Sequence, residues 1–306
     1  MIIALLLLNV FLGASEAAAV KMSRAAAKSI LLCATTRDVA STNIAHNLIQ
    51  RSAYFKEITA GVWRAQGAAC SSVYLWLQQE SLLQLDHCDR LFREHAGIDK
   101  PIDEVLFLSK HAAASGKPSL TVHPIGIAYQ TENERSGGIP GRCSPPSSRI
   151  GAIYRELYDR VGAAGAYPGV KGFEVTLEAT HHGPHVDLPT AFLEIGSTED
   201  YWGNPDAGRL WGDLLQSHLG LVEGGAPAPP PEDEAGLESG LHAATAGITV
   251  MGIGGGHYTP GMNDIARSAG RGLYIGHTLA TYALAGHMDG SAPTQVPGGW
   301  RQIIRY

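Results

Sequence analysis

The chain has 306 residues, of which 44% are hydrophobic and 17% are charged, and its formal net charge is −6. This composition is typical of a globular protein with a large core and excludes a disordered chain. The acidic balance excludes a protein that coats nucleic acid through a broad basic surface, so we expect no DNA partner, although a local basic patch could grip one RNA end. Cysteines 33, 70, 88 and 143 form no CxxC pair, so we expect reduced thiols and neither a disulfide framework nor a zinc knuckle.

The first 21 residues are set apart from the predicted fold. Their apolar run, residues 2–12, is followed by small residues and resembles a secretory signal. No basic residue precedes the run, and it is too short to span a membrane, so we expect no stable membrane association. Two interpretations stay open: a genuine leader, or an extension created by a start assigned upstream of Met22. The predicted location is the cytoplasm, with organelle or secretory targeting as the alternative if the leader is genuine.

Short continuous apolar runs predict buried strands of an α/β sheet, and apolar residues at helical spacing predict amphipathic helices. In chain order we expect strands near 29–34, 73–77, 104–109, 119–122, 173–180, 191–195, 247–253 and 273–277, and helices near 43–51, 148–164 and 206–221. Gly/Pro-rich residues 130–148 predict a loop or lid, and the Pro/acidic stretch 223–239 predicts a flexible insert. We therefore predict one α/β catalytic domain, residues 22–306, with a mixed, largely parallel sheet flanked by helices.

Histidines stand at the ends of several expected strands. They are His111, His123, His181, His182, His257 and His277. In α/β sheets the ligand crevice lies outside the carboxyl ends of the strands. Packing alone does not explain so many histidines at such positions, so we expect them to line one crevice.

The densest group of titratable residues lies within residues 173–197. This stretch predicts a strand, a loop that contains His181, His182 and His185 (called the His-rich loop below) and a second strand. If the first strand continues, Glu178, Thr180 and His182 share one face and His181 points to the other. A Gly-Pro turn follows, and Glu194 stands in the next apolar strand. Adjacent histidines near a carboxylate are typical of general acid/base catalysis or of a metal site. The alternative is a pair of histidines hydrogen-bonded to the backbone of a tight turn.

Absent motifs limit the chemistry further. The sequence has neither HExxH nor CxxC, so metal ligands would come from different strands. The candidates are His181, His182, His123 and His257. The Gly-rich stretch before His257 lacks the Lys-Ser/Thr of a P-loop, and we expect its backbone to approach a substrate closely. No GxSxG elbow is present, which argues against a covalent serine mechanism.

Several sequence blocks carry a family resemblance. They are EVLFLSKH (104–111), LTVHPIG (120–126), LEATHHGP (177–184), FLEIGSTE (192–199) and GIGGGHY (252–258), followed by Gly276-His277. In order and spacing they resemble the archaeal and plant type of D-aminoacyl-tRNA deacylase, and not the bacterial type, which has a different fold. The resemblance implies hydrolysis of the ester between a D-amino acid and the 3′-terminal ribose of tRNA, in proofreading or detoxification. It also implies a phosphorylase/peptidyl-tRNA hydrolase-like fold and dependence on Zn²⁺.

A catalytic hypothesis follows for the His-rich loop. An aminoacyl ester is already activated, so a positioned water and an oxyanion stabiliser suffice. We predict that His182 or His181, oriented by Glu178 or Glu194, is the base for that water, with Thr180 beside it. A Zn²⁺ ion is the alternative means of lowering the pKa of the water.

The remaining candidates are expected to face the substrate. Backbone N–H groups of Gly254, Gly255 and Gly256 would stabilise the oxyanion or hold the terminal phosphate. The wall of the site would be completed by His111, His123 and His257, as metal ligands or as ribose contacts. Candidates for contacts with tRNA phosphates are Lys110, Lys117 and Arg149.

The chain departs from the family pattern in three places, one of which is the Pro-rich insert at 223–239. Thr259-Pro260-Gly261 stands where the family has Ala-Pro-Arg, so a basic residue is missing, and the chain stops at Tyr306, which predicts a C-terminal truncation. Two other functions stay open: a metal-dependent hydrolase of small D-aminoacyl compounds, and a non-catalytic protein that binds a nucleotide or an RNA end. The sequence does not indicate the oligomeric state.

Overall fold

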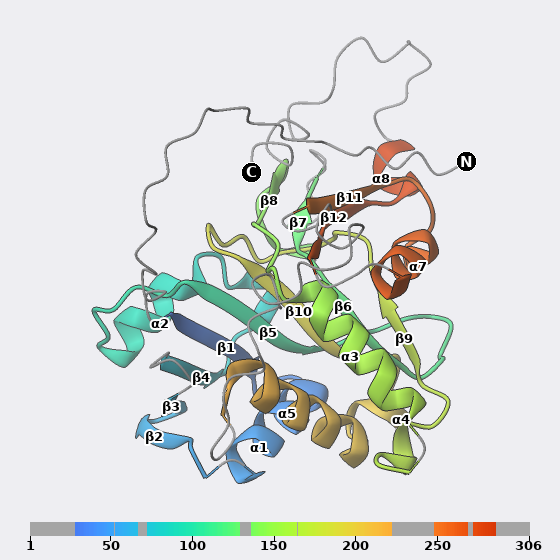
Figure 1. Ribbon diagram of the computed structural model, residues 1–306. Coiled ribbons are helices and arrows are strands. Elements are labelled where there is room, and N and C mark those ends of the chain that lie inside the picture. Colours follow the sequence, from blue (N-terminus) through green and yellow to red (C-terminus); the bar gives the residue numbers. More distant parts are fainter. Residues whose placement is uncertain are drawn as a thin grey trace, which may run out of the picture.

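Figure 1 shows a computed structural model of the protein, which describes residues 28–51, 53–66, 72–128, 136–163, 165–221, 248–268 and 272–285. The predictions for residues 1–21, for the insert 223–239 and for the C-terminal end lie outside these residues. The main sheet has eight strands: β1 (Ser29–Thr35), β2 (Lys56–Thr59), β3 (Val62–Gln66), β4 (Ser72–Gln78), β5 (Glu104–Lys110), β6 (Ser119–His123), β9 (Glu174–Leu177) and β10 (Thr190–Gly196). Their order across the sheet is β2-β3-β4-β1-β5-β10-β6-β9.

Parallel strands form the middle of this sheet. β4, β1, β5 and β10 pair in parallel, β6 runs antiparallel to β10, and β9 runs parallel to β6. β2 and β3 form an antiparallel hairpin at the far edge, next to β4. Strands that are buried on both faces read as continuous apolar runs, which is why the central strands were recognisable in the sequence. The predicted mixed α/β sheet is confirmed.

Helices cover both faces of the sheet (Figure 1). On one face lie α1 (Val39–Arg51), α3 (Ile150–Gly162) and α5 (Pro205–Leu219), whose buried residues share one core with Ile30 and Leu32 of β1. On the other, α2 (Cys88–Ala96) and the 3-10 turn η2 (Leu82–Gln84) pack against Leu31 and Cys33. Short elements η4 (Pro168–Val170) and α4 (Glu199–Trp202) lie in the connections after α3 and after β10. The three predicted helices are present.

A smaller unit lies beside β9 and α3. It contains the parallel pair β11 (Ile248–Ile253) and β12 (Leu273–Leu279), with α7 (Pro260–Ser268) and α8 (Thr281–Ala285). The prediction that residues 247–253 form a central strand of the main sheet was wrong, because β11 pairs with β12 and not with the main sheet. Two backbone bonds tie this unit to the loop after β9: Ala179 donates to His257 at 2.8 Å and Thr180 donates to Thr278 at 2.7 Å.

The predicted loop at 130–148 is described from residue 136 onward. It contributes β8 (Arg142–Cys143), which pairs with β7 (Gly126–Ile127) directly after β6. This pair of short strands contacts the His-rich loop: the N–H of Gly126 donates a hydrogen bond to the carbonyl of His182 at 2.9 Å. Among the described residues, no helix combines the length and the apolarity needed to cross a membrane.

Candidate active site

A cluster of titratable side chains forms where β6 and β9 end beside the middle of β10. Because β6 is antiparallel to β10, Thr121 lies opposite Glu194, and His123 lies opposite Phe192. The end of β5, the loop after β9 and the loop after β11 converge on the same place. The cluster, called the His/Glu cluster below, consists of His111, His123, Glu178, His181, His182, Glu194 and His257. The sequence predicted their convergence, but the antiparallel β6, not a common set of parallel strand ends, brings them together.

Glu194 is the only charged residue of β10 and is almost completely buried. Its carboxylate accepts the Thr121 hydroxyl at 2.9 Å and lies 3.6 Å from Nδ1 of His111 and 3.7 Å from Nε2 of His123. Burial alone would raise the pKa of Glu194, but polar contacts with the two imidazoles hold it well below its usual range. Although burial opposes it, contact with Glu194 raises the pKa of His111 and of His123. An ionised Glu194 therefore anchors both histidines.

Glu178 occupies the centre of the cluster, and its side chain is 0% exposed. Its Oε1 lies 3.1 Å from Nδ1 of His111, and its Oε2 lies 3.1 Å from Nε2 of His257. Nε2 of His181 is 3.6 Å from the same Oε2. Of these three imidazoles, His257 is hydrogen-bonded to the carboxylate and can exchange a proton with it without a water intermediary.

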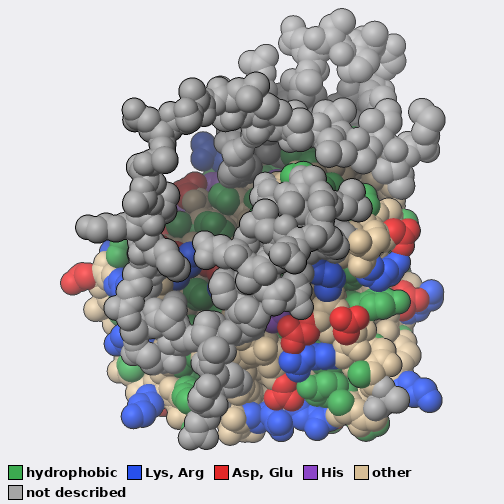
Figure 2. All heavy atoms as spheres, in the orientation of Figure 1, with side chains coloured by type: hydrophobic (Ala, Val, Ile, Leu, Met, Phe, Trp, Pro, Cys, Tyr) green, Lys and Arg blue, Asp and Glu red, His purple; other side chains and the backbone are tan. Residues whose placement is uncertain are grey.

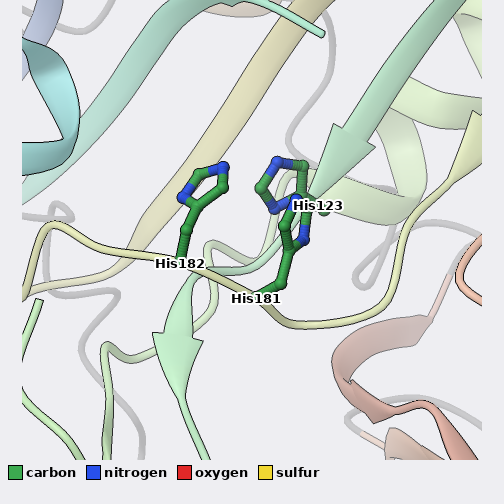
Figure 3. Close-up of side chains that lie close together, drawn as sticks. All are labelled: His123, His181 and His182. Atoms are coloured by element: carbon green, nitrogen blue, oxygen red, sulfur yellow. The ribbon is translucent and has the colours of Figure 1, made fainter. Parts of the chain in front are cut away.

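His123, His181 and His182 bring their rings together (Figure 3), with centroid separations of 4.3 Å for the first pair, 4.3 Å for the second and 5.0 Å between the outer two. Each ring directs Nδ1 at a backbone carbonyl. These carbonyls belong to Pro124, Ala179 and Gly183, at 3.1, 2.7 and 2.6 Å. A carbonyl only accepts, so each Nδ1 carries a proton and each neutral ring keeps its lone pair on Nε2. Nε2 of His123 is buried and has no hydrogen-bond partner among the described residues.

The His-rich loop holds its two adjacent imidazoles in the neutral form. Burial, together with the neighbouring rings, lowers the pKa of His181 well below its usual range and that of His182 to about 4. His182 has a φ of 43°, in the left-handed region that is uncommon for residues other than glycine. A Cβ atom at Gly183 would clash with the backbone of Gly138, so this turn admits only glycine there. Neutral imidazole is the form that ligates metal ions.

Three overlapping groups in the cluster could hold a metal ion, because their ligand atoms all lie within 4.8 Å of one another. They are His123 with His181 and His182, then Glu178 with His181 and His257, and then His111 with Glu178 and Glu194. The first group consists only of imidazoles, and the Nδ1 atom of each ring is held by a backbone carbonyl. Metal-ligating histidines typically donate their second ring nitrogen in this way.

The side chains after β9 do not lie as predicted from a strand that continues to residue 180. β9 ends at Leu177, so the alternation does not continue, and His181 rather than His182 approaches Glu178. The hydroxyl of Thr180 accepts the backbone N–H of Thr278 at 3.1 Å, so it donates to Nδ1 of the buried His277 at 3.0 Å. Thr180, predicted beside the base, therefore ties the loop to β12. His277 lies within β12, where burial lowers its pKa to about 4, and it is not part of the His/Glu cluster.

The predicted substrate contacts lie around the cluster. Lys110 is exposed at the end of β5, with Nζ 4.4 Å from the ring centroid of Trp202. The N–H of Gly254 donates to Leu279 at 2.7 Å, so this group is already engaged. Gly255 and Gly256 face open space, since a Cβ on either would meet nothing within 4 Å.

The two other predicted phosphate contacts have partners within the chain. Arg149 is bound to Glu104 at 2.9 Å and to the carbonyl of His218 at 2.8 Å, so it stabilises the fold. Lys117 pairs with Glu174 at 3.0 Å on the surface, where such a pair is weak and leaves the cation accessible.

Three hydroxyl groups of the site are not among the residues predicted to form it. Thr121 donates to Glu194, the Tyr258 hydroxyl lies 3.0 Å from Nε2 of His111, and the Tyr282 hydroxyl lies 2.8 Å from Nδ1 of His257. Thr121 could have been found because it stands two residues before His123 and thus on the same strand face. Tyr258 follows His257 directly, whereas nothing in the sequence around Tyr282 distinguishes it.

An α/β sheet that carries a buried, metal-capable cluster of histidines and carboxylates defines a class: hydrolytic enzymes with a His/Glu centre. Comparison with known proteins then specifies the family. The family model for D-aminoacyl-tRNA deacylase matches residues 98–296. The chain belongs to the D-aminoacyl-tRNA deacylase family, a family of hydrolases, which confirms the family and the enzyme class predicted from the sequence.

Similar proteins extend over most of the chain. A D-aminoacyl-tRNA deacylase of Arabidopsis thaliana is 37% identical over 90% of this chain and 83% of its own length. One of Caldivirga maquilingensis is 31% identical over 74% and 71%. Among solved structures, a conserved protein of unknown function, AF0625, shares the fold with a TM-score of 0.63 at 24% identity, over 85% of this chain and 79% of its own. Futalosine hydrolase of Helicobacter pylori matches with a TM-score of 0.41 at 12% identity, over 64% and 99%.

Proposed function

We propose that the chain hydrolyses the ester of D-aminoacyl-tRNA at the His/Glu cluster and releases the free D-amino acid and tRNA. One observation carries the proposal: a fully buried carboxylate, Glu178, stands between His111 and His257, beside the imidazole cluster of His123, His181 and His182. Such a site can both accept a proton and stabilise developing charge, which ester hydrolysis requires. Family membership supports the same reaction.

The donor set of His123, His181 and His182 fits a zinc ion. All three ligands are imidazole nitrogens, their Nδ1 atoms are held by carbonyls, and Nε2 of His123 is buried without a hydrogen-bond partner among the described residues. Zinc bound there would act as a Lewis acid that polarises the ester carbonyl and lowers the pKa of water. Two of these rings have strongly lowered pKa values, so we now assign His181 and His182 to ligation rather than to the role of base.

Glu178 is the proton acceptor in this proposal. A carboxylate that takes a proton from water can return it to the ribose oxygen as the ester bond breaks, while Nε2–H of His257, 3.1 Å away, hydrogen-bonds to that carboxylate. Glu194 stays ionised and keeps His111 and His123 in place while the charge of the cluster changes.

The tRNA end would enter over the exposed side of the cluster. His257, Gly255 and Gly256 are accessible there, and backbone at these glycines can come close to a ribose or a phosphate. Lys110 lies next to His111 with its ammonium group on the surface. On the face shown in Figure 2, basic and acidic side chains are interspersed, which suits recognition of one RNA end better than coating of a whole RNA.

Deacylation of D-Tyr-tRNA and L-Tyr-tRNA tests the proposal, with Glu178→Gln as the critical variant. We expect wild type to release D-Tyr much faster than L-Tyr, and Glu178→Gln to lose about 100-fold or more in kcat. Glu174→Gln is the matched control, because Glu174 lies in β9, four residues earlier, and its side chain is 59% exposed. We expect this control to keep wild-type turnover.

Other outcomes separate the rival functions. Turnover of D-tyrosine esters with no turnover of D-Tyr-tRNA would identify a hydrolase of small D-aminoacyl compounds. Saturable binding of the tRNA end without release of the amino acid would identify a binding protein. Full activity of Glu178→Gln would contradict the assignment of the proton acceptor.

A further inference from the structure

Two tyrosines at the rim of the His/Glu cluster each hold the outward nitrogen of one of its histidines. Tyr258 Oη lies 3.0 Å from Nε2 of His111, and Tyr282 Oη lies 2.8 Å from Nδ1 of His257. The inward nitrogens of the same two rings are each 3.1 Å from an oxygen of Glu178. The five side chains therefore form one line of polar contacts, with a phenol at each end and a carboxylate in the middle.

Proton positions along this line follow from the carboxylate. An ionised Glu178 only accepts, so the inward nitrogens of His111 and His257 carry protons. In a neutral imidazole the other nitrogen then accepts, so each phenol must donate its O–H to it. Burial raises the pKa of Tyr258, which keeps that hydroxyl protonated at neutral pH. Each phenol thus favours the tautomer that presents an N–H to Glu178.

The backbone fixes both phenols relative to the cluster while leaving their rings accessible. The carbonyl of Tyr258 accepts the side-chain amide of Asn263 in α7 at 2.9 Å. Tyr282 is the second residue of α8, whose first residue, Thr281, donates its N–H to Gly255 at 2.9 Å. The tyrosines are nevertheless 37% and 51% exposed, so they stand where a substrate passes.

We propose that Tyr258 and Tyr282 are positioning residues, whose hydroxyls hold His111 and His257 in the tautomer and orientation that donate to Glu178. The proposal deepens the proposed function and rests on it. Without a phenol, the outward nitrogen loses its donor, and the imidazole can exchange tautomers or turn away. Glu178 then loses an ordered N–H group that faces one of its two oxygens, which weakens its control of the proton in the reaction. The hydroxyl is required for this role, whereas the ring is not.

Removal of the hydroxyls alone tests the proposal. Tyr258→Phe and Tyr282→Phe should each lower kcat for D-Tyr-tRNA about 5- to 30-fold and leave KM within about twofold, as expected for one lost hydrogen bond to a reacting group. The double variant should lose more than either single variant. Tyr158→Phe is the control, because Tyr158 is an exposed tyrosine of α3, outside the cluster, and its removal of a hydroxyl should change neither constant.

Histidine ¹⁵N NMR of the full chain gives a readout that is independent of turnover. We expect the tautomer signature of His111 to change in Tyr258→Phe and that of His257 in Tyr282→Phe, with melting temperatures unchanged. Wild-type kcat in both single variants overturns the proposal. A rise in KM alone also overturns it, because it would make the phenols substrate-binding groups. If wild type fails to deacylate D-Tyr-tRNA, the proposed function falls, while the NMR comparison still decides whether the phenols set the tautomers.

Discussion

The His/Glu cluster and the hydroxyl groups that contact it form two halves, which are held to the protein in different ways. The first, called the sheet half, consists of Thr121 and His123 from β6, Glu194 from β10 and His111 directly after β5, and all four are buried. The second, called the rim half, consists of His257, Tyr258 and Tyr282 from the β11–β12 unit, and its side chains are partly or largely exposed. The His-rich loop after β9 joins the two.

The buried half keeps charged groups in a fixed geometry, and the exposed half forms the opening for the substrate. Buried charged groups keep a fixed geometry only when each has a partner, and Glu194 has three partners within the sheet half. An opening for a large substrate must instead be built from groups that tolerate water, and the rim half supplies them. We therefore expect changes in the sheet half to affect both stability and activity, and changes in the rim half to affect mainly activity.

Glu194→Gln should have the largest effect on stability and on activity. The change leaves two buried imidazoles without their ionised partner, and breaking a buried charge pair typically costs about 3–5 kcal/mol. We expect the free energy of unfolding to fall by about that amount and kcat to fall about 100-fold or more. Glu199→Gln, in the exposed helix α4, is the control. Wild-type stability in Glu194→Gln would contradict the view that the sheet half is held by this carboxylate.

Zinc should stabilise the protein through the three imidazoles shown in Figure 3. A ligand at about 100 times its Kd adds about 2.7 kcal/mol to the free energy of unfolding, a rise in melting temperature of about 5–10 °C. We expect this shift on adding Zn²⁺ to chelator-treated protein, together with recovery of activity. His123→Gln should abolish the shift, whereas His46→Gln, on the exposed side of α1, should keep it. An unchanged melting temperature in wild type would exclude zinc at these imidazoles.

The sequence was sufficient to predict the two histidines and the glutamate of the sheet half because their signals are local. Continuous apolar runs mark the buried strands, and Glu194 is conspicuous as a charge inside one of them. The identities of the clustered histidines followed from their places at strand ends. What could not be predicted was the direction in which each ring points. His181, and not His182 as the strand alternation predicted, approaches Glu178, because β9 ends at Leu177 and the chain turns, which no periodicity records.

The rim half was predicted poorly for a different reason. Its position depends on contacts between segments far apart in the sequence, such as the backbone bond from Ala179 to His257. β11 has the same apolar pattern as the central strands, yet it pairs only with β12 among the described residues. Tyr282 reaches His257 through a short helix that carries no motif. Tertiary packing, not local pattern, therefore decides which residues complete the site.

Asn263→Ala should weaken the attachment of the rim half. The Asn263 side chain accepts the N–H of Leu177 at 2.7 Å and donates at 2.9 Å both to the Thr176 hydroxyl and to the Tyr258 carbonyl. We expect a loss of about 2 kcal/mol in the free energy of unfolding and a loss of about tenfold in kcat. The zinc-induced rise in melting temperature should persist, because the sheet half is untouched. Asp264→Ala, the exposed neighbour in α7, is the control. Loss of the zinc response in Asn263→Ala would show that the halves are not independent.

An ion pair outside both halves should make the smallest contribution to the free energy of unfolding, and this contribution should depend on pH. Glu156 of α3 lies 2.8 Å from Nε2 of His218 in α5. Burial would raise the pKa of Glu156, but His218 and Arg160 lower it below its ordinary value of 4.5. Because the folded pKa is below the unfolded one, the pair stabilises the protein fully above pH 4.5 and loses this contribution as pH falls through the folded pKa.

Glu156→Gln tests this sign. Since the carboxylate is 30% exposed, solvent screens the pair, and we expect a deficit of only about 1 kcal/mol or less in the free energy of unfolding at pH 7. Urea unfolding of wild type and variant across pH 3 to 7 should show the deficit shrink toward zero at the acid end. Turnover of D-Tyr-tRNA at pH 7 should be equal in the two proteins, because neither half of the cluster includes α3. A deficit that grows as the pH falls would reverse the assigned direction of the pKa shift.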